Sequence, residues 1–453
     1  MKFDVVIIGA GPAGYEAAVF AAKQGLNTAV IEKAELGGTC LNNGCIPTKT
    51  LLHTADLYHE VQSQSAQIGL TSDNFAFSMT KMQERKNFVL NQLRNAIAQL
   101  FKANKITLFT GTAKIIGEQE ISVTDKENNT THIQAAKILI TSGSVPAIPP
   151  IEGADLAQTS DDLLKCETAY DNLIIIGGGV IGIEFASLYT SLGKNVIVIE
   201  ALDRILANMD KEFAQSLKMI LTKRGAQIKT KAFVTKITEE NGKFTCQYKI
   251  KDKVEEVTAD AVLMAVGRRP YSDNLFDEAF KPQIEFTKNA LKVNEYYQTT
   301  CPSIYAAGDV IGGIQLAHVA TAEAINAICH ILGKQPIYDM NAIPSCVYTN
   351  PEIASVGMSA EEAKKLGKKI TSLKYPMSAN GKSLLSLQER GFIKIIVEPE
   401  TNIILGAQLM CARATDIISQ ITMAIDNKLT VADLQKVIYP HPTFSEGIGQ
   451  ALL

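Results

Sequence analysis

The sequence lacks the features that mark membrane, secreted and nucleic-acid-binding proteins. Its 453 residues carry 44 Lys and Arg against 47 Asp and Glu, so no basic excess is present to attract nucleic acid. No apolar run is long enough for a membrane-spanning helix, because Gly, Lys, Gln and Asp interrupt each one. The first apolar run, residues 5–8, has no basic segment before it and leads into glycines, unlike a signal peptide. We therefore expect a cytoplasmic protein without membrane or nucleic-acid partners.

Cysteine is present but rarely clustered. Only Cys40 and Cys45 lie close together, and in a chain of this kind a single close pair indicates redox or metal chemistry. Zinc needs about four ligands, and His53 and His59 are poorly spaced to complete such a set. A structural disulphide closing so short a loop would add little stability. A redox-active pair without a metal is therefore predicted. The other cysteines are isolated, as expected in a reducing compartment: Cys166, Cys246, Cys301, Cys329, Cys346 and Cys411.

The length predicts about three domains. A repeated pattern occupies part of the sequence. Residues 3–32 have the pattern of a strand, a glycine loop, an alanine-rich helix and a second strand that ends at Glu32. The same order recurs from Leu173 to Glu200. Each acid lies 23 positions after the first glycine of its loop (32 − 9 and 200 − 177). The loop glycines are Gly9, Gly11 and Gly14 in the first copy and Gly177, Gly179 and Gly182 in the second.

Both copies have the sequence of a dinucleotide-binding βαβ unit. Glycines allow the backbone to approach a pyrophosphate, the helix N-terminus stabilises its charge, and the acid accepts hydrogen bonds from a ribose hydroxyl. One such motif could be an ordinary strand-to-helix turn, but two with the same acid offset indicate two dinucleotides. Glu200 would repel a 2′-phosphate, which favours NAD over NADP at the second copy. Arg204 weakens this argument, although a solvated arginine needs no ligand.

Other segments complete the predicted architecture. Predicted strands end in small residues at 138–143, 262–267 and 305–309, and ligands of open α/β sheets bind at such carboxyl ends. From about Met340 the pattern changes to mixed strands and helices without a glycine loop, which predicts a separate domain. The basic run 364–369 in that domain is interpreted as a solvated helix face.

Residues 80–104 predict a long amphipathic helix on the surface. We assign it no chemistry. The apolar positions that define its predicted face are Met82, Val89, Leu93, Ile97 and Leu100.

The cysteine pair lies beside a predicted helix start. Pro47 suits the first position of a helix that continues through Ala55, so Cys45 would lie next to a helix N-terminus. The helix dipole there favours a thiolate. Lys49 opposes the same dipole, which suggests another task, such as polarising a bound cofactor.

Together these motifs resemble the class I pyridine nucleotide-disulphide oxidoreductases over nearly the whole chain. Within that family, Leu41, Ile46 and Thr48 resemble the dihydrolipoyl dehydrogenases more than the glutathione and mercuric reductases. Two conservative departures are Thr141-Ser142-Gly143-Ser144, where the family usually has Ala-Thr-Gly-Ser, and Tyr439-Pro440 before His441. The resemblance rests on the first glycine loop with Glu32, Cys40 to Lys49, Gly177 to Gly182 with Glu184, Gly267 to Pro270, Ala307 to Asp309, and His441 to Glu446.

The resemblance implies an α/β fold with two Rossmann-like dinucleotide-binding domains, for FAD and NAD, and a C-terminal α+β dimerisation domain. The implied boundaries are 1–145 for the first part of the FAD domain, 146–268 for the NAD domain, 269–338 for the returning FAD segment and 339–453 for the dimerisation domain. The implied cofactor-binding residues are Gly9, Gly11, Pro12, Ala13, Gly14, Glu32, Lys33, Gly38, Thr39, Cys40, Cys45, Lys49, Gly143, Gly308, Asp309, Ala317, His318, Gly177, Gly179, Ile181, Gly182, Glu200, Gly267 and Arg268.

The same resemblance implies the catalytic roles. His441, held by Glu446, would take a proton from a dihydrolipoyl dithiol, and the resulting thiolate would attack Cys40. Cys45 would leave as a thiolate, with Lys49 paired to Glu184 beside the flavin, and the electrons would pass through FAD to NAD.

The resemblance also implies partners, because the family joins His441 to the cysteines of a second chain. We therefore expect a homodimer. Its substrates would be dihydrolipoyl groups on acyltransferase or glycine-cleavage carrier proteins, supplied by other chains.

Three alternatives stay open at this point. The enzyme could run in the opposite direction, as a glutathione- or mercuric-reductase-like enzyme that reduces a disulphide, although Leu41 and Glu200 argue against this. The chain could be a flavoprotein electron-transfer or redox-sensing partner, although a sensor needs no positioned base. Finally, His441 taken alone could be a capped turn histidine, but the prolines on both sides restrict its backbone and Glu446 can orient its ring.

Overall fold

The computed structural model describes residues 1–71, 74–388 and 390–453. It divides into two compact units, each built from three segments of the chain. The first unit contains Met1–Thr50, Gln83–Ala147 and Arg268–Asp339, and the second contains Leu51–Met82, Ile148–Gly267 and Met340–Leu453. No helix among the described residues is long and apolar enough to cross a membrane.

The first unit is built on a mixed seven-stranded sheet. The order is β3-β2-β1-β6-β5-β4, and β18 pairs with β6. The strands β3, β2, β1, β6 and β18 run parallel, whereas β4, β5 and β6 form an antiparallel meander. The bounds are β1 (Lys2–Ile8), β2 (Thr28–Glu32), β3 (Thr107–Thr110), β4 (Thr112–Gly117), β5 (Glu120–Thr124), β6 (Thr130–Ile140) and β18 (Ile304–Ala306).

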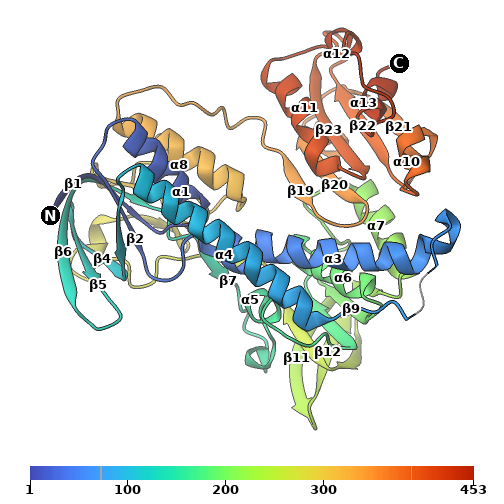
Figure 1. Ribbon diagram of the computed structural model, residues 1–453, viewed down its shortest axis with the longest axis horizontal. Helices are drawn as coiled ribbons and strands as arrows, with labels where there is room; N and C mark the ends of the chain where they lie inside the picture. Colours follow the sequence, from blue (N-terminus) through green and yellow to red (C-terminus); the bar gives the residue numbers. More distant parts are fainter. Residues whose placement is uncertain (72–73, 389) are drawn as a thin grey trace. The chain divides into compact units, whose positions relative to one another are not determined.

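Helices of the first unit pack on this sheet. The helices α1 (Pro12–Lys23) and α8 (Ala317–Ile331) pack against each other and lie side by side in Figure 1. Small residues of α1, among them Ala17 and Ala18, permit this close packing and are fully buried. The remaining elements are α2 (Gly38–Asn43), most of α4 (Met79–Ala103), the short strands β7 (Ser144–Pro146), β15 (Arg268–Pro270), β16 (Phe286–Thr287) and β17 (Ala290–Leu291), and the 3-10 turns η3 (Lys281–Gln283) and η4 (Asp309–Ile311).

The second unit contains a smaller parallel sheet of order β10-β9-β8-β14. The strands β8, β9 and β14 are rich in Ile, Val and Leu and mostly buried, as a parallel sheet covered on both faces requires, whereas no residue of the edge strand β10 is buried. A three-stranded antiparallel sheet, β11-β12-β13, lies in the same unit. The bounds are η2 (Ala154–Leu156), α5 (Ser160–Leu163), β8 (Asn172–Ile176), α6 (Val180–Ser191), β9 (Asn195–Glu200), α7 (Lys211–Lys223), β10 (Gln227–Thr230), β11 (Ala232–Glu240), β12 (Lys243–Ile250), β13 (Lys253–Ala259) and β14 (Ala261–Met264).

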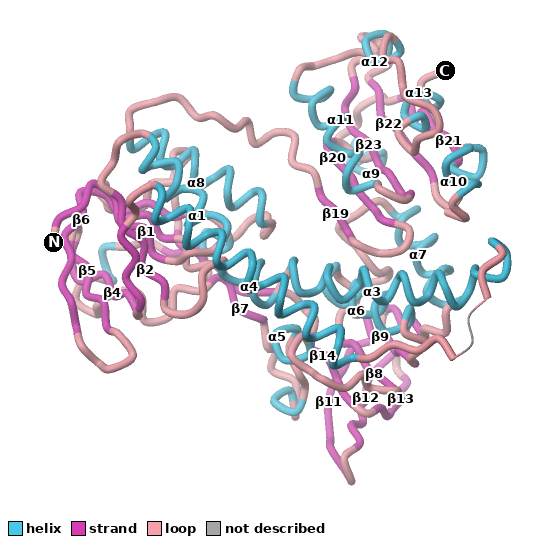
Figure 2. Tube along the Cα trace, viewed as in Figure 1, coloured by secondary structure: helices cyan, strands magenta, loops and turns pink. Residues whose placement is uncertain are grey.

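The C-terminal part of the second unit is a five-stranded antiparallel sheet of order β19-β20-β23-β22-β21. The helix α11 packs on β20 and β23, and Figure 2 shows it against these strands. Mixed strands and helices do follow Met340, but this part shares a compact unit with residues 148–267, so the separate domain stays a prediction. The bounds are β19 (Ser345–Val347), β20 (Glu352–Gly357), α9 (Ala360–Lys365), β21 (Thr371–Pro376), η5 (Met377–Ala379), α10 (Gly381–Leu385), β22 (Phe392–Val397), β23 (Ile404–Cys411), α11 (Ala414–Asp426), α12 (Val431–Gln435) and α13 (Glu446–Ala451).

The helix α3 (Cys45–Gln64) begins in the first unit and continues into the second, and η1 (Ser65–Ile68) follows it. The structure confirms a helix at this place, but it begins at Cys45 rather than at Pro47. The predicted surface helix is confirmed as α4, with a face that differs from the prediction. Leu93 and Leu100 are exposed, whereas Leu90 and Phe101 are buried.

Candidate active site

The first glycine loop connects β1 to α1. Gly9 has a φ of 105°, a backbone conformation that L side chains rarely adopt. A Cβ on Gly14 would lie 1.9 Å from the carbonyl oxygen of Gly9, so only glycine permits the helix to start this close to the strand. The carboxylate of Glu32 accepts hydrogen bonds from the backbone N–H of Ala10 at 2.7 Å and of Ala34 at 2.9 Å. The acid at the end of β2 is therefore fixed beside the loop.

The second glycine loop repeats this geometry 168 positions later. The helices α1 and α6 begin at residues 12 and 180 and end at residues 23 and 191. Gly177 has a φ of 110°, and a Cβ on Gly182 would lie 2.1 Å from the carbonyl oxygen of Gly177. Glu200 accepts from the backbone N–H of Gly178 and, at 2.6 Å, from that of Leu202. The predicted repeat is thus confirmed in backbone conformation, helix length and hydrogen bonding.

The remaining predicted residues of the two loops follow the same plan. Pro12 is the first residue of α1, and Ala13 is buried against the first loop. Ile181 is in the first turn of α6. The ammonium group of Lys33 lies over the ring of Tyr271, 4.0 Å from its centroid.

The helix that carries Cys40 lies against the first glycine loop. It starts after Gly37, and a Cβ on Gly38 would lie 2.5 Å from the Cα of Gly11. Two glycines are therefore needed where α2 meets the loop, and α2 in turn contains Thr39 and Cys40. The first loop and the cysteine helix are therefore in direct contact.

A side chain of α4, Arg94, forms a hydrogen bond with this cysteine helix. The sequence did not predict this contact. Asn42 donates to the backbone carbonyls of Leu36 at 3.1 Å and Gly38 at 2.9 Å. Arg94 donates through Nε to the Asn42 side-chain oxygen at 2.7 Å. The amide of Asn42 is satisfied on both sides, which fixes the turn of chain around Cys40.

The two cysteines face each other as thiols, both partly exposed. The pKa of the Cys40 thiol is raised, first by its hydrogen bond with Cys45 and then by burial, while the charge of Lys49 lowers it. Cys45 begins α3, so its sulphur lies at a helix N-terminus, where negative charge is stabilised. Both effects favour a thiolate at Cys45 over one at Cys40. The described residues contain no group of three or more His, Cys, Asp or Glu that could hold a metal.

Lys49 and Glu184 belong to different units, so their predicted pairing stays a prediction. Lys49 lies one turn beyond Cys45 on α3. Glu184 is buried on α6, and its Oε1 accepts from the backbone N–H of Tyr348 at 3.1 Å.

A polar group lies at the carboxyl ends of β6 and β18. Asp309 accepts a hydrogen bond from the hydroxyl of Ser144 at 2.5 Å. Arg268 donates to the same hydroxyl through Nε and to the Ser144 carbonyl oxygen through Nη2, both at 2.8 Å. The structure thus brings Arg268 together with Asp309, in the first unit, whereas Gly267 belongs to the second unit. Gly143 has a φ of 74° and gives the chain its turn into β7.

Glu323 of α8 is a further residue of this edge that sequence reasoning missed. Its carboxylate accepts from the backbone N–H of Gly308 at 2.8 Å. Burial raises the pKa of Glu323 to about 7, the hydrogen bond from Gly308 opposes this shift, and the charge of Asp309 adds to it. The same helix starts with Ala317 and His318, both predicted at the cofactor. The available signal was the single acidic residue of a helix that is otherwise mostly apolar or small.

The predicted base lies in the second unit, immediately before α13. His441 Nδ1 is 2.8 Å from Oε1 of Glu446, and Oε2 of Glu446 accepts from the backbone N–H of Thr443 at 2.7 Å. These two hydrogen bonds, the backbone one first, hold the pKa of Glu446 below its usual value. A carboxylate at Nδ1 fixes the ring and leaves Nε2 to accept a proton. The His441 side chain is 77% exposed, so Nε2 is open to a reactant from outside the chain.

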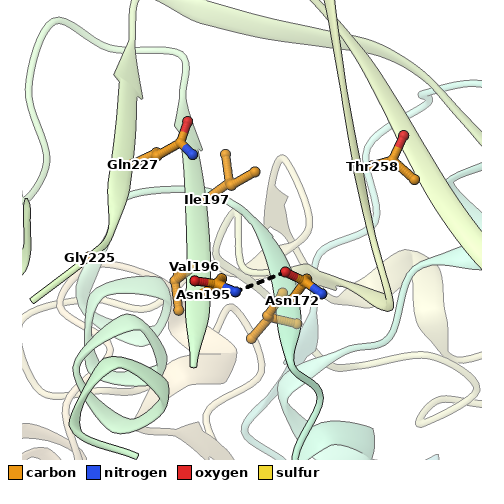
Figure 3. Close-up of a pocket in the computed structure, with 8 residues that line it drawn as sticks. Asn172, Asn195, Val196, Ile197, Gly225, Gln227 and Thr258 are labelled. Carbon is orange, nitrogen blue, oxygen red and sulfur yellow. Dashed lines mark hydrogen bonds between the residues drawn. The ribbon is translucent and has the colours of Figure 1, made fainter. Parts of the chain in front are cut away.

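A small cavity lies at the other end of the strands of the second unit. It has a volume of about 150 Å³, and four of its eight lining residues are polar (Figure 3). Asn195 donates to Asn172 at 3.0 Å and joins the first residues of β9 and β8. Because nucleotides of α/β enzymes bind beyond the carboxyl ends of the strands, we assign this cavity no ligand.

Comparison with known proteins agrees with the site. Residues 3–324 match the pyridine nucleotide-disulphide oxidoreductase family, and residues 343–452 match the dimerisation domain of that family. A dihydrolipoyl dehydrogenase of Bacillus subtilis (strain 168) is 37% identical and aligns with 99% of this chain and 98% of its own length. The mitochondrial dihydrolipoyl dehydrogenase of Bos taurus is 35% identical, with coverages of 99% and 90%.

Solved structures of similar proteins also match over the whole chain. The Cu(II) complex of the HOCl-induced flavoprotein disulfide reductase RclA from Escherichia coli has a TM-score of 0.89 and 30% identity, covering 100% of this chain and 99% of that one. LpdA from Mycobacterium tuberculosis has a TM-score of 0.91 at 26% identity, with the same coverages. The chain belongs to the pyridine nucleotide-disulphide oxidoreductase family.

Proposed function

We propose that the chain is a dihydrolipoyl dehydrogenase, which oxidises dihydrolipoyl groups on carrier proteins to the disulphide and reduces NAD⁺ to NADH. The observation that carries this proposal is the exposed His441, oriented by Glu446. A dithiol substrate must lose a proton before it can attack a disulphide, and this histidine is placed to take one. An electron-transfer or sensing flavoprotein would not need such a base. The full-length similarity to dihydrolipoyl dehydrogenases supports the same conclusion.

The residues of the two loops fit FAD and NAD. The first loop, with Glu32 and the edge around Asp309, would hold FAD, and the second, with Glu200, would hold NAD. Each loop lacks side chains where a pyrophosphate must approach, and each has a carboxylate beside it for ribose hydroxyls. Bound FAD would accept an electron pair from the cysteines and pass it to NAD⁺ as a hydride equivalent.

The dithiol chemistry uses the protein's own groups. His441 Nε2 takes a proton from one substrate thiol, and the thiolate attacks the Cys40 sulphur of the oxidised Cys40–Cys45 disulphide. Cys45 leaves as a thiolate, stabilised by the α3 N-terminus and by the charge of Lys49. The second substrate thiol then attacks the substrate sulphur of the mixed disulphide and displaces Cys40, which takes up the second proton, so the substrate becomes a disulphide and the cysteine pair becomes reduced. Lys49, in our proposal, pairs with Glu184.

The proposed assembly is a homodimer in which His441 serves the cysteines of the partner chain. The family's dimerisation domain in residues 343–452 supports the dimer. The exposure of the histidine supports its service in the partner's site. The proposed domain limits are those of the sequence analysis: 1–145 and 269–338 for FAD, 146–268 for NAD and 339–453 for dimerisation. We place the enzyme in the cytoplasm, where lipoyl-bearing acyltransferases or glycine-cleavage carriers would supply the substrate.

The test is NADH formation by the purified flavin-containing protein with dihydrolipoamide and NAD⁺. Parallel reactions replace NAD⁺ by NADP⁺, or dihydrolipoamide by reduced glutathione. Fast NADH formation only with dihydrolipoamide and NAD⁺ is expected. Flavin reduction without turnover, or faster NADH consumption with another disulphide, would contradict the proposal and identify a reductase of different specificity.

A further inference from the structure

Arg204 lies in the loop that follows Glu200, and this loop folds back onto the second glycine loop. The backbone N–H of Leu206 donates to the carbonyl oxygen of Gly178 at 2.8 Å. The Cγ2 atom of Ile205 is 3.0 Å from the position that a Cβ on Gly178 would take. The loop therefore borders the place where the adenosine ribose of a dinucleotide meets Glu200. An arginine so placed is the group by which NADP-dependent enzymes bind the 2′-phosphate.

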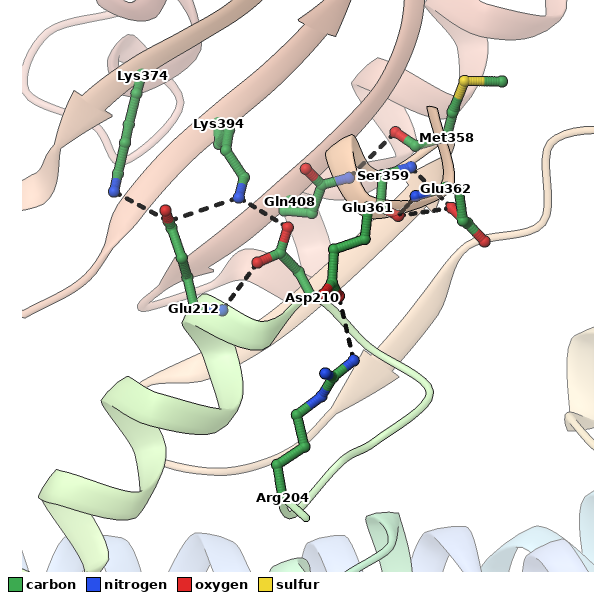
Figure 4. A network of polar contacts seen from close by, with 10 residues as sticks. All are labelled: Arg204, Asp210, Glu212, Met358, Ser359, Glu361, Glu362, Lys374, Lys394 and Gln408. Carbon is green, nitrogen blue, oxygen red and sulfur yellow. Dashed lines mark hydrogen bonds and ion pairs between the residues drawn. The ribbon is translucent and has the colours of Figure 1, made fainter. Parts of the chain in front are cut away.

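The guanidinium group of Arg204 is directed toward the helix α9 instead. Its Nη2 atom is 3.1 Å from Oε2 of Glu361 and 3.2 Å from the carbonyl oxygen of Ala207. Glu361 lies in the first turn of α9, and Figure 4 shows the ion pair between the two segments. The two side chains are 29% and 31% exposed, so the pair is partly shielded from water.

The helix that carries Glu361 is itself fixed. Ser359 and Glu362 form reciprocal hydrogen bonds at the start of α9, and this capping box holds the first helical turn. A buried ion pair joins the same two regions, with Lys394 Nζ 2.7 Å from Oδ2 of Asp210 (Figure 4). Asp210 also caps α7 through the backbone N–H of Glu212 at 2.9 Å. These contacts fix the helical turn that carries Glu361 and so keep its carboxylate opposite the loop.

We propose that Glu361 is a specificity-determining residue that pairs with Arg204 and so prevents Arg204 from binding a 2′-phosphate. The inference rests on the proposed function, in which the second loop binds NAD. Discrimination against NADP then has two parts. Glu200 repels the phosphate directly, and Glu361 removes the cation that would attract it. The second part comes from the domain beyond residue 340, not from the dinucleotide-binding fold.

Removing the Glu361 charge leaves the guanidinium group partly shielded and without its carboxylate. Its Nε atom is already buried and has no hydrogen-bond partner among the described residues. A 2′-phosphate would offer charged oxygens to such a group. Glu200 remains and continues to repel the phosphate, so only part of the discrimination is lost. NAD has only a neutral 2′-hydroxyl at this position, which offers Arg204 no charge to pair with, so its affinity stays nearly constant.

The experiment measures binding of NAD⁺ and NADP⁺ to the purified flavin-containing protein by isothermal titration calorimetry. The variants are Glu361→Gln, Arg204→Gln and the double variant. The matched control is Glu212→Gln, which removes a carboxylate from the same pair of segments, where Glu212 contacts Lys374 and Lys394 but not Arg204. Glu361→Gln should strengthen NADP⁺ binding by about fivefold and change NAD⁺ binding by less than about twofold, as expected for one partly exposed charge pair. The double variant should lose this gain.

Unchanged NADP⁺ affinity in Glu361→Gln would overturn the inference. An equal gain in the double variant, or in Glu212→Gln, would overturn it too, because the gain would then come from lost negative charge or loosened packing and not from Arg204. If the wild-type protein binds no NAD⁺, the proposed function fails together with the inference. NAD⁺ binding without the Arg204-dependent gain rejects the inference alone.

Discussion

The two glycine loops share one backbone geometry but differ in what covers them. Gly11 of the first loop is partly buried, and the cysteine helix lies so close that a Cβ on Gly38 would reach the Gly11 Cα at 2.5 Å. Gly179, its counterpart in the second loop, is exposed, and nothing lies within 4 Å of the position of an added Cβ. The glycine loop is therefore covered by protein in the first copy, which we call closed, and exposed in the second, which we call open.

This difference corresponds to the two kinds of ligand in the proposed reaction. A resident cofactor gains from contacts on several sides, because each contact that excludes water adds to its retention. A co-substrate must leave after every turnover, so an exposed loop suits it. The repeated motif supplies the means of binding a dinucleotide, and we expect the segments around each copy to determine how firmly the dinucleotide is held.

The largest expected effect comes from placing the same substitution in both loops. Gly14→Ala puts a Cβ 1.9 Å from the Gly9 carbonyl oxygen, and Gly182→Ala puts one 2.1 Å from that of Gly177. Gly14→Ala should yield protein without flavin and without activity. Gly182→Ala should retain flavin and lose NAD⁺ binding by roughly a hundredfold or more, because a clash of this size must displace the loop by about 1 Å.

The measurements for this pair are flavin content per chain, from visible absorbance, and NAD⁺ binding by calorimetry. Circular dichroism checks that both variants fold. Loss of flavin from both variants to the same extent would mean that the two copies are not separate sites, and the comparison between them would be wrong.

His441→Gln should separate the two half-reactions. Glutamine keeps the polar character of the side chain but cannot take a proton from a thiol. Dihydrolipoamide oxidation should fall by roughly a hundred- to ten-thousand-fold, the usual contribution of a general base. Reduction of the flavin by NADH, which we propose to occur at the second loop, should change by less than about twofold. Stopped-flow measurement of each half-reaction tests this, and an equal loss in both would remove His441 from its proposed role.

Local sequence patterns were sufficient to predict the repeat. Its glycines, its terminal acids and the offset between them all lie within 30 consecutive residues, and each is required by backbone geometry or by ligand chemistry. The His441 to Glu446 contact could be predicted for the same reason, since five residues separate the partners.

Contacts between distant segments could not be predicted in this way. Arg94 and Asn42 are 52 positions apart, and Arg204 and Glu361 are 157 apart. Nothing in the local pattern of either partner distinguishes it from a solvated polar residue. The helix α4 illustrates the same limit, because it has apolar residues on more than one face. Burial of Leu90 and exposure of Leu93 depend on which face the rest of the first unit covers.

The substitution Lys394→Met tests how much the buried ion pair between Lys394 and Asp210 stabilises the region around the second loop. Lys394 and Asp210 are 7% and 3% exposed, so the substitution leaves a buried carboxylate without its cation. We expect a loss of about 3–5 kcal/mol in the free energy of unfolding, as for other broken buried pairs. The matched control is Lys374→Met, whose partner Glu212 is 37% exposed and whose loss should cost about 1 kcal/mol or less. Urea unfolding of both variants measures the difference, and equal losses would show that burial of the Lys394 pair has no special importance.

The smallest expected effect concerns Glu323, on the closed side of the comparison. Its pKa is raised from 4.5 to about 7, chiefly by burial, so ionisation costs free energy in the folded protein that it does not cost in the unfolded chain. The stability that comes from the neutral carboxyl is fully present below pH 4.5 and is lost as the pH rises through about 7. Its neighbours are the Gly308 N–H, which favours the charged form, and the Asp309 carboxylate, which opposes it.

Glu323→Gln keeps an acceptor for the Gly308 N–H but cannot ionise. The variant should match the wild type near pH 4.5 and exceed it above pH 7, by at most about 3 kcal/mol in the free energy of unfolding. Denaturant unfolding at a series of pH values measures this, with the exposed Glu120→Gln as the control that should leave the pH profile unchanged. A variant whose profile parallels the wild type would show that Glu323 does not titrate near neutral pH. If Glu323→Gln flattens the pH profile only when flavin is bound, the carboxyl is buried by the ligand and not by the protein alone. The cost of ionisation then arises in the occupied cofactor site.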